Sequence, residues 1–242
     1  MSEPTSPSEF LSACSVEPAI FELRPDYRAM LIVVDGLSPA TNTREGYGAV
    51  AELVATAEAH ARTLLAATPV GELPHIAAWR EAYRAFGAKP QRTRNSLEAL
   101  VRRAETGLPR VNALTDTYNA ISVIHQIPLG GEDFHRYEGP ARLIRATGTE
   151  RFDTALNGEA LTEYPEPGEV VWCDDVGVTC RRWNWRQGRR TGLTHETRSA
   201  LFILDTLAPV TYEQLTAATD ALTEALSSLG GDVQVFQRLI AA

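Results

Sequence analysis

Three polar residues recur at helical spacing in the middle of the chain and could line a binding site. Asn112, Asp116 and Asn119 lie at i, i+4 and i+7, so a helix over residues 112–126 places them on one stripe. Such residues, repeated on one face of a helix, either satisfy backbone groups or line a pocket. A pocket wall of this kind would bind a small ligand that carries an amide or an ammonium group. The alternative is an internal hydrogen-bond network that ties the helix to a sheet.

The segment that follows this helix, PLGGEDFHRYEG, predicts a turn-rich loop with chemistry of its own. The backbone N–H groups of Gly130 and Gly131 could approach a ligand closely because no Cβ intervenes. The same pair also fits an ordinary tight turn. Carboxylates in or near the loop are candidates for binding an ammonium group, and these are Glu132, Asp133 and Glu196.

Histidines stand around this loop without forming a familiar catalytic or metal-binding pattern. His125 and His135 flank it, and His195 precedes the Glu196 carboxylate. A lone histidine is more often packed or exposed than catalytic, so none of the three is assigned as a base. The spacing of His135 relative to the acidic pair in the loop is unlike any familiar ligand set. We therefore expect neither a metal nor another cofactor.

A basic, aromatic ribbon spans residues 180–191, with the sequence CRRWNWRQGRRT. It holds five arginines, two tryptophans and no acidic residue, although the whole protein has a formal net charge of -8. Guanidinium groups match phosphate and carboxylate geometry, and indole faces stack on bases or guanidiniums. We expect RNA contacts from four of its arginines: Arg182, Arg186, Arg189 and Arg190. In the alternative, the tryptophans pack in the core and the arginines pair with acidic neighbours.

The overall composition is that of an ordinary globular protein. The 242 residues are 44% hydrophobic and 22% charged. The negative net charge argues against a general nucleic-acid coat protein, so a polyanionic partner would need a local basic patch. No apolar run is long enough to span a bilayer, and no signal-peptide pattern is present, so we expect a cytoplasmic protein with reduced thiols. Whether Cys173 and Cys180 face each other across a hairpin stays open.

Helices are predicted over residues 48–67, 75–86, 95–105, 112–126 and from Thr211 onward. Asn95 and Glu98 have capping-box spacing, and Glu98 is expected to face away from the apolar side of its helix. Short apolar or β-branched runs predict strands over residues 29–34, 141–146, 168–173, 177–183, 200–207 and 232–236.

The order of these elements predicts an α+β fold, in which mixed or antiparallel sheets form a sandwich-like core with flanking helices. A hairpin is expected across residues 169–183, with the basic ribbon on its second strand. Residues 1–15 are rich in Ser, Pro and Glu, so we expect a loose N-terminus followed by a single domain over residues 16–242.

The helix, the loop and their flanks share a longer pattern of residues: Pro109-Arg110-Val111-Asn112, Asp116, Tyr118-Asn119, Pro128-Leu129 and Asp133, flanked by Thr194-His195-Glu196-Thr197 and a helix over 94–105. This pattern resembles the editing module, the B3/B4 domain, of the bacterial phenylalanyl-tRNA synthetase beta subunit. The resemblance covers roughly residues 75–207, and the chain resembles a free-standing version of the module.

The resemblance implies hydrolysis of a wrongly attached amino acid from the end of a tRNA, as part of translation quality control. In the family, a Thr-Asn pair and a loop histidine line the amino acid pocket. Asn119 keeps the asparagine, whereas Tyr118 replaces the threonine and Gly130 replaces the histidine. Loss of that histidine implies that the accepted amino acid differs from tyrosine, or that editing is weak or lost.

An aminoacyl ester is labile, so such a site needs only to hold the ester, place a water and stabilise the oxyanion. The sequence contains no nucleophile elbow. The resemblance implies a role for Asn119 in orienting the water or the substrate amine, with Tyr118 in the pocket wall. The expected partners are a tRNA acceptor end and its amino acid, with no membrane partner.

Two other classes of function stay open. One is a module that binds an RNA end or an amino acid without turnover, and filling of the pocket by Tyr118 would favour it. Turnover would instead be favoured by a histidine, His125 or His135, in the place left by the loop histidine. The other class is a small-molecule hydrolase, which predicts that the arginines of residues 181–190 pair internally.

Overall fold

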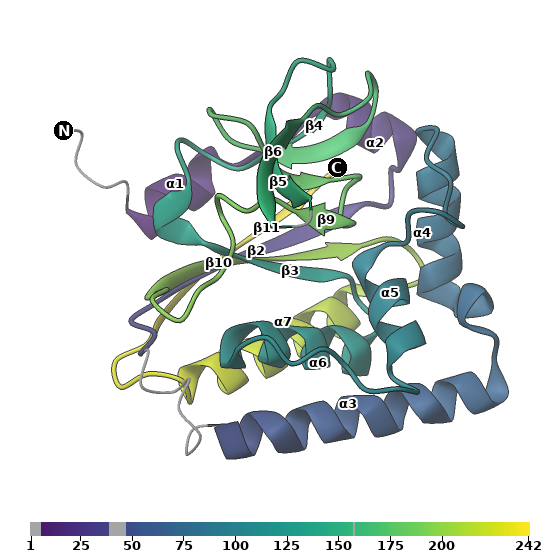
Figure 1. Cartoon of the computed structure of the whole chain (residues 1–242), viewed down its shortest axis with the longest axis vertical. Coiled ribbons are helices and arrows are strands. Elements are labelled where there is room, and N and C mark those ends of the chain that lie inside the picture. The colour runs from purple at the N-terminus through teal and green to yellow at the C-terminus, as the bar shows by residue number, and fades with distance from the viewer. Residues whose placement is uncertain (1–5, 39–46, 157) are drawn as a thin grey trace.

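The structure is a computed structural model that describes residues 6–38, 47–156 and 158–242. Within these ranges the chain forms seven α-helices and eleven β-strands in two sheets. Both sheets and the helices form one folded unit, in which a four-stranded sheet lies between a layer of helices and the second sheet (Figure 1). The expected α+β class with antiparallel and mixed sheets is confirmed.

The four-stranded sheet is antiparallel throughout, in the order β11–β2–β10–β3. Its strands are β2 (Arg28–Asp35), β3 (Leu129–Asp133), β10 (Ser199–Thr206) and β11 (Gln234–Ala241). Because side chains alternate along a strand, β2 places apolar side chains on both faces of the sheet. Ile32 points into the helical layer and Leu31 into the core on the opposite face, and both side chains are fully buried.

Helices cover one face of this sheet. They are α3 (Tyr47–Ala67), α5 (Ser96–Arg103), α6 (Ala113–His125) and α7 (Tyr212–Ser227). Helix α4 (Pro74–Ala85) runs along the side of the molecule (Figure 1). Predicted start signals are observed, since Asn95 accepts a hydrogen bond from the Glu98 N–H at 2.9 Å. Thr211 and Gln214 form a capping box at the start of α7.

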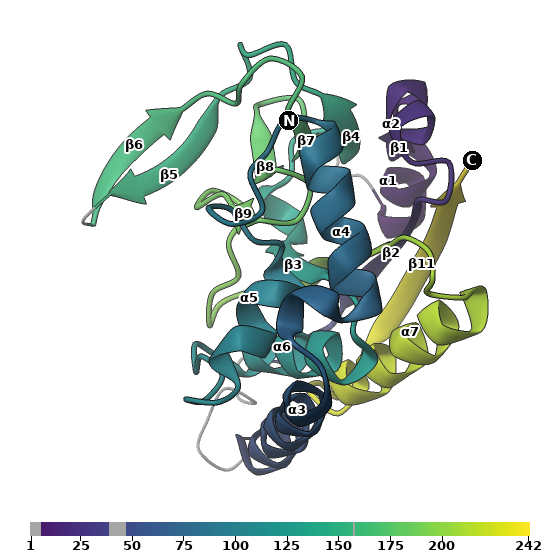
Figure 2. The ribbon, with the colours of Figure 1, turned by 90° about the vertical axis from the view of Figure 1, so that its right-hand side faces the viewer.

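The second sheet covers the other face and is mixed. Its members are β1 (Ser15–Val16), β4 (Arg142–Arg145), β5 (Phe152–Leu156), β6 (Glu159–Glu163), β7 (Val170–Cys173), β8 (Val178–Arg181) and β9 (Arg186–Gln187). The β5–β6 hairpin projects from the body of the molecule (Figure 2). The core beneath the sheet is aromatic, with Trp79, Trp172 and Trp183 almost fully buried.

The predicted hairpin over residues 169–183 is confirmed, but its second strand ends early. Strand β8 stops at Arg181, and the next two residues, Arg182 and Trp183, have positive φ angles of 47° and 68°. This reversal turns the Trp183 ring into the aromatic core, where it packs edge-on against Trp79 with 5.1 Å between centroids. The register places Cys173 opposite Val178, and both Cys173 and Cys180 are free thiols.

The expectation of a loose N-terminus is wrong for the part that the structure describes. Residues Pro7–Ala13 form helix α1, which begins with a capping box between Ser6 and Glu9. Helix α2 (Pro18–Leu23) follows. Phe10 of α1 is buried and packs edge-on against Phe134 with 5.0 Å between ring centroids. Helix α1 therefore belongs to the aromatic core beneath the second sheet. Residues 1–5 lie outside the described residues.

Two local expectations are also wrong. Gly130 and Gly131 do not form a turn but lie in strand β3, which pairs with β10. Glu98 does not face solvent: its side chain is fully buried, and Arg80 binds both of its oxygens, at 2.8 and 2.9 Å. In each case a partner far along the chain determines the conformation, which local periodicity does not reveal.

Candidate functional site

A cavity of about 220 Å³ lies between helices α5 and α6, strand β3 and the two sheets. Its lining residues are Ser96, Ala99, Leu100, Tyr118, Asn119, Leu129, Gly130, Glu132, Trp172, Cys180, Trp183, Asn184, Trp185, Gln187, Ile203 and Asp205. Most of this wall is apolar or aromatic. A few polar groups project from different elements, which is the usual composition of a small-molecule pocket.

Asn119 is the polar side chain that α6 contributes to this cavity. It is 8% exposed, and among the described residues its amide has no hydrogen-bond partner. Ser96, on α5, likewise has a buried hydroxyl that lacks a partner within the described part of the chain. Buried polar groups are normally hydrogen-bonded, so an unpartnered amide in a pocket wall is available to a ligand.

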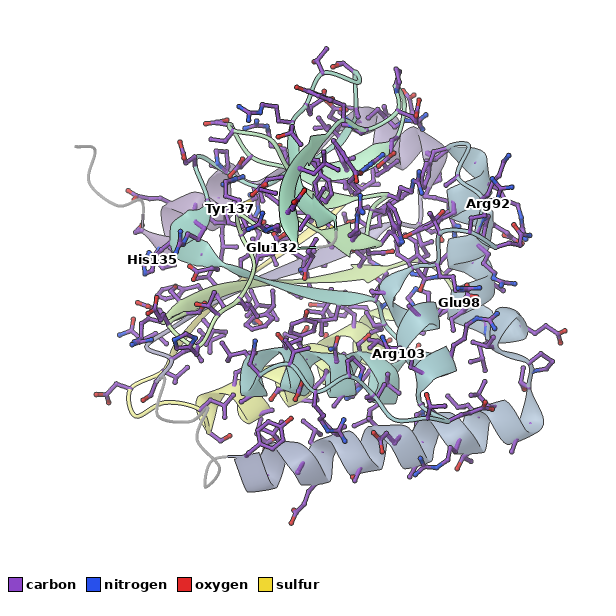
Figure 3. All side chains as sticks on the ribbon, viewed as in Figure 1. Arg92, Glu98, Arg103, Glu132, His135 and Tyr137 are labelled. Atoms are coloured by element: carbon purple, nitrogen blue, oxygen red, sulfur yellow. The ribbon has the colours of Figure 1, made fainter. Side chains whose placement is uncertain are left out.

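Glu132 enters the cavity from strand β3 and is 3% exposed. Tyr137 donates its hydroxyl to Oε2 of this carboxyl group, and Thr191 donates its hydroxyl to Oε1 at 3.1 Å. Figure 3 shows Glu132 and Tyr137 as labelled side chains beside the end of β3. Burial raises the pKa of Glu132 to about 7, in spite of these hydrogen bonds, which lower it.

Asp205 enters the cavity from the other side, near the end of β10, and is 3% exposed. Tyr27 donates its hydroxyl to Oδ1 at 2.6 Å, and Asn184 donates its amide to Oδ2 at 3.3 Å. Tyr83 in turn donates to the Asn184 carbonyl oxygen at 2.9 Å, which fixes the orientation of that amide. Burial raises the pKa of Asp205 to about 7.

The two carboxyl groups give the cavity its electrostatic character. Glu132 and Asp205 are acidic residues of the cavity lining. Among the described residues, no arginine, lysine or histidine lines the cavity. A cation that enters would stabilise both carboxylates and lower their pKa values. The arrangement therefore suits a ligand with an apolar body and a positively charged group.

Four of the predicted site residues meet at this cavity: Tyr118, Asn119, Gly130 and Glu132. Asn112 does not reach it, because it caps α6 by accepting a hydrogen bond from the Thr115 N–H at 2.8 Å. Asp116 is buried, accepts from the Val111 N–H at 2.9 Å and from the Tyr47 hydroxyl, and so holds the start of the helix. The predicted polar stripe thus divides into two structural residues and one pocket residue.

Three further predicted residues lie outside the lining. Gly131 is in β3, where its carbonyl oxygen accepts a hydrogen bond from Gln187 at 3.1 Å. Asp133 accepts from the Thr197 hydroxyl at 2.7 Å and from the His135 N–H at 3.0 Å, so it organises the short helix that follows. Glu196 is exposed, and its side chain lies 3.9 Å from the ring of His195.

The histidines around this region do not line the cavity either. His125 is half-buried at the end of α6, whereas His135 and His195 are exposed. Burial and the nearby His60 lower the pKa of His125. Among the described residues, no group of three His, Cys, Asp or Glu side chains is arranged to hold a metal ion.

The B3/4 domain family matches residues 78–231, well over half of the chain. The chain belongs to the B3/4 domain family. Every residue that lines the cavity lies within the B3/4 segment. No curated protein shows a significant match to this chain.

A solved structure with a similar arrangement is an N-terminal fragment of the phenylalanyl-tRNA synthetase beta-subunit from Pyrococcus horikoshii. The TM-score is 0.47 at 12% sequence identity, and the match covers 93% of this chain. The B3/4 chain matches only 53% of the length of that fragment.

The basic ribbon of this B3/4 protein is largely neutralised by carboxylates of its own chain. Arg181 is buried and forms a two-pronged salt bridge with Glu169, at 2.8 Å for both contacts. Nη2 of Arg190 donates to both carboxylate oxygens of Asp174, at 2.7 and 2.8 Å. These contacts correspond to the internal pairing that the small-molecule hydrolase alternative predicts.

Two further arginines of the ribbon stack on Trp185. Arg182 and Arg186 lie over the Trp185 ring at 4.5 and 4.7 Å from its centroid, and Arg186 also pairs with Glu163. Both contacts compete with stacking of a base on that indole. Of the four arginines predicted to bind RNA, only Arg189 is classed as exposed, and no ion pair involves it among the described residues.

Sequence reasoning missed several pocket residues of the B3/4 segment. Asp205 follows directly after the apolar run 200–204 of β10, and this isolated carboxylate in a buried strand is a signal that could have been used. Asn184 and Gln187 lie within the ribbon, where the arginines dominate the pattern. Ser96 is the first residue of α5, where a serine indicates the start of a helix and not a pocket residue.

Proposed function

We propose that this B3/4 protein binds the amino acid moiety of an aminoacyl ester and hydrolyses that ester on a mischarged tRNA. The observation that carries the proposal is the unpartnered Asn119 amide in an apolar cavity that also holds two buried carboxyl groups. The cavity of about 220 Å³ is smaller than typical drug-binding pockets, which span about 300–1,000 Å³, and suits an amino acid.

Each polar group has a role in this proposal. Asp205 pairs with the α-ammonium group, and the tryptophans contact the apolar side chain. The Glu132 carboxylate accepts a proton from water as the water oxygen attacks the ester carbonyl carbon, and Asn119 donates a hydrogen bond to the developing oxyanion. The carbon–oxygen bond to the ribose then breaks, and Glu132 returns the proton to the ribose oxygen. The products are a free amino acid and an uncharged tRNA.

The test is loss of ester from a panel of mischarged tRNAs, compared with a buffer control. Asn119→Ala should lower kcat/KM by about 10²-fold, because one oxyanion donor is lost. Asn112→Ala is the matched control, since this asparagine caps the same helix outside the cavity. No acceleration with any tRNA would refute the proposal, and full activity in Asn119→Ala would refute the assigned role of that residue.

A second candidate is a module that binds an amino acid without turnover. It is favoured by two observations: neither His125 nor His135 lines the cavity, and Tyr118 does. Calorimetric titration with free amino acids distinguishes the candidates. Saturable binding that Asn119→Ala weakens, in a protein that hydrolyses no charged tRNA and no amino acid methyl ester, would favour the binding module.

A further inference from the structure

We propose that a tRNA end reaches the cavity across a basic surface formed by α5, the loop before it and Arg80 of α4, and not across the ribbon of residues 180–191. This α5 basic surface consists of Arg80, Arg92, Arg94, Arg102 and Arg103. The identity of the partner rests on the proposed function. The location of the surface rests on the observations that follow.

The centre of the surface is one buried carboxylate surrounded by three arginines. Oε1 of Glu98 lies 2.8 Å from Arg80, 3.0 Å from Arg102 and 3.8 Å from Arg94. The Glu98 side chain is fully buried, whereas those of Arg94 and Arg102 are 44% and 40% exposed. A single negative charge therefore gathers three positive charges in one place, and guanidinium N–H groups stay available to another anion.

The charge around this centre is positive over a longer stretch of chain. Residues 80–103 contain seven arginines and lysines and two glutamates, a net charge of +5 in a protein of net charge -8. Arg92 and Arg103 are exposed, and within the described residues no ion pair involves either of them. The ribbon has five arginines, but carboxylates from elsewhere in the chain neutralise most of them.

Helix α5 connects the surface to the cavity. Ser96 and Ala99 line the cavity and are half-buried, so they lie on its more accessible side. Arg103 follows them at i+7 and i+4, which places it on the same face of the helix. Figure 3 shows Arg103 on α5, and Glu98 and Arg92 farther along the same side of the molecule.

These features fit a single-stranded RNA end better than an acidic protein. A cavity of amino acid size admits only the end group of a chain, while the phosphates that precede it stay outside. Arginines in the loop before α5 and along α5 could follow such a backbone, and guanidiniums bind phosphate in a bidentate manner. A folded acidic partner would contact the arginines without using the cavity.

The experiment measures binding of uncharged tRNA by fluorescence anisotropy over a range of salt concentrations. We expect the double variant Arg92→Ala/Arg103→Ala to weaken binding at low salt by about tenfold and to reduce the slope of log K against log salt by about two. Arg189→Ala, the matched substitution in the ribbon, should bind tRNA within about twofold of the unchanged protein. Equal melting temperatures would show that the variants are folded.

Two results would overturn the α5 basic surface: no measurable tRNA binding, or an Arg189→Ala variant that is impaired as much as the double variant. Displacement of tRNA by polyglutamate at equal charge concentration would instead indicate an acidic protein partner.

Failure of the proposed function can be distinguished from failure of the α5 basic surface. If the double variant loses tRNA binding but the protein hydrolyses no charged tRNA, the α5 basic surface is supported and the proposed hydrolase activity is refuted. If the protein hydrolyses mischarged tRNA and the double variant has an unchanged KM for it, the α5 basic surface is refuted and the hydrolase activity is supported.

Discussion

Two asparagines on the same stripe of α6 have different surroundings. Asn112 accepts a hydrogen bond from the backbone at the start of the helix, whereas Asn119, two turns later, faces the cavity without a protein partner. Helical periodicity predicts that they share a face. It does not show what that face contacts, because the opposing residues come from β10, α5 and the ribbon, which are distant in sequence.

This difference predicts opposite effects of alanine substitution on stability and on function. Asn112→Ala should lower the free energy of unfolding by about 1 kcal/mol, because the helix loses its cap. Asn119→Ala should change the free energy of unfolding by less than about 0.5 kcal/mol, because no hydrogen bond within the described chain is lost. Urea denaturation measures both values, and a larger loss in Asn119→Ala than in Asn112→Ala would contradict this account.

The buried carboxyl groups predict a pH dependence of stability. Burial raises the pKa of Glu132 from 4.5 to about 7, so between these values the folded protein binds more protons than the unfolded chain. The stabilisation is complete below about pH 4.5 and is lost as the pH rises through about 7. Asp205, whose pKa is also about 7, acts in the same direction.

Glu132→Gln should therefore flatten the fall in melting temperature between pH 5 and pH 8, roughly halving it, because one of the two groups no longer titrates. Thermal unfolding at a series of pH values measures the effect. Glu138→Gln is the control, since this exposed residue lies outside the cavity. An unchanged profile in Glu132→Gln would mean that Glu132 is ionised throughout this range.

At the scale of elements, strand β3 departs most from what its sequence predicts. Two successive glycines before acidic residues are typical of a turn, yet here they pair with β10. The packing gives the reason. A Cβ on Gly131 would lie 2.7 Å from the Phe202 ring and 3.0 Å from that of Tyr118. Glycine lets these two rings approach the strand, and that requirement comes from tertiary contacts.

The two glycines predict a graded response. Gly131→Ala should lower the free energy of unfolding by about 1–3 kcal/mol, because two aromatic rings would have to move. Gly130→Ala should cost less, because its Cβ would meet only the amide end of the long Gln187 side chain, at 2.9 Å, and that side chain can rotate away. Since Gly130 lines the cavity, its substitution should instead weaken ligand binding. Chemical denaturation and ligand titration of both variants test this order.

Most helices were predictable because their signals are local. Apolar spacing and capping residues lie within each segment, as in α7, where Thr211 and Gln214 form a capping box at the predicted start of the helix. The turn after β8 was not predictable, because Arg182 and Trp183 adopt positive φ angles that only the aromatic core explains. Asn119, Gly130 and Glu132 were found through the helix and loop pattern and Tyr118 through the family resemblance, whereas Asp205 depends on how β10 is placed opposite α6.

At the scale of the whole molecule, one sheet joins two cores. The helices α3, α5, α6 and α7 contribute to the core on one face of β2 and β10, and all four tryptophans pack in or against the core on the other face. Leu31 and Ile32 are neighbours in sequence, yet they belong to different cores. No helix within the described residues is long and apolar enough to cross a membrane.

The shared sheet predicts that both cores unfold together in one cooperative transition. Leu31→Ala and Ile32→Ala should each lower the free energy of unfolding by about 2–5 kcal/mol, because each side chain is fully buried. Tryptophan fluorescence reports on one core, and the far-ultraviolet circular dichroism of the helices reports mainly on the other. In both variants the two signals should keep one common midpoint, since neither core can lose its strand alone. If Leu31→Ala moved only the fluorescence transition and Ile32→Ala only the helical one, the cores would be separate folding units.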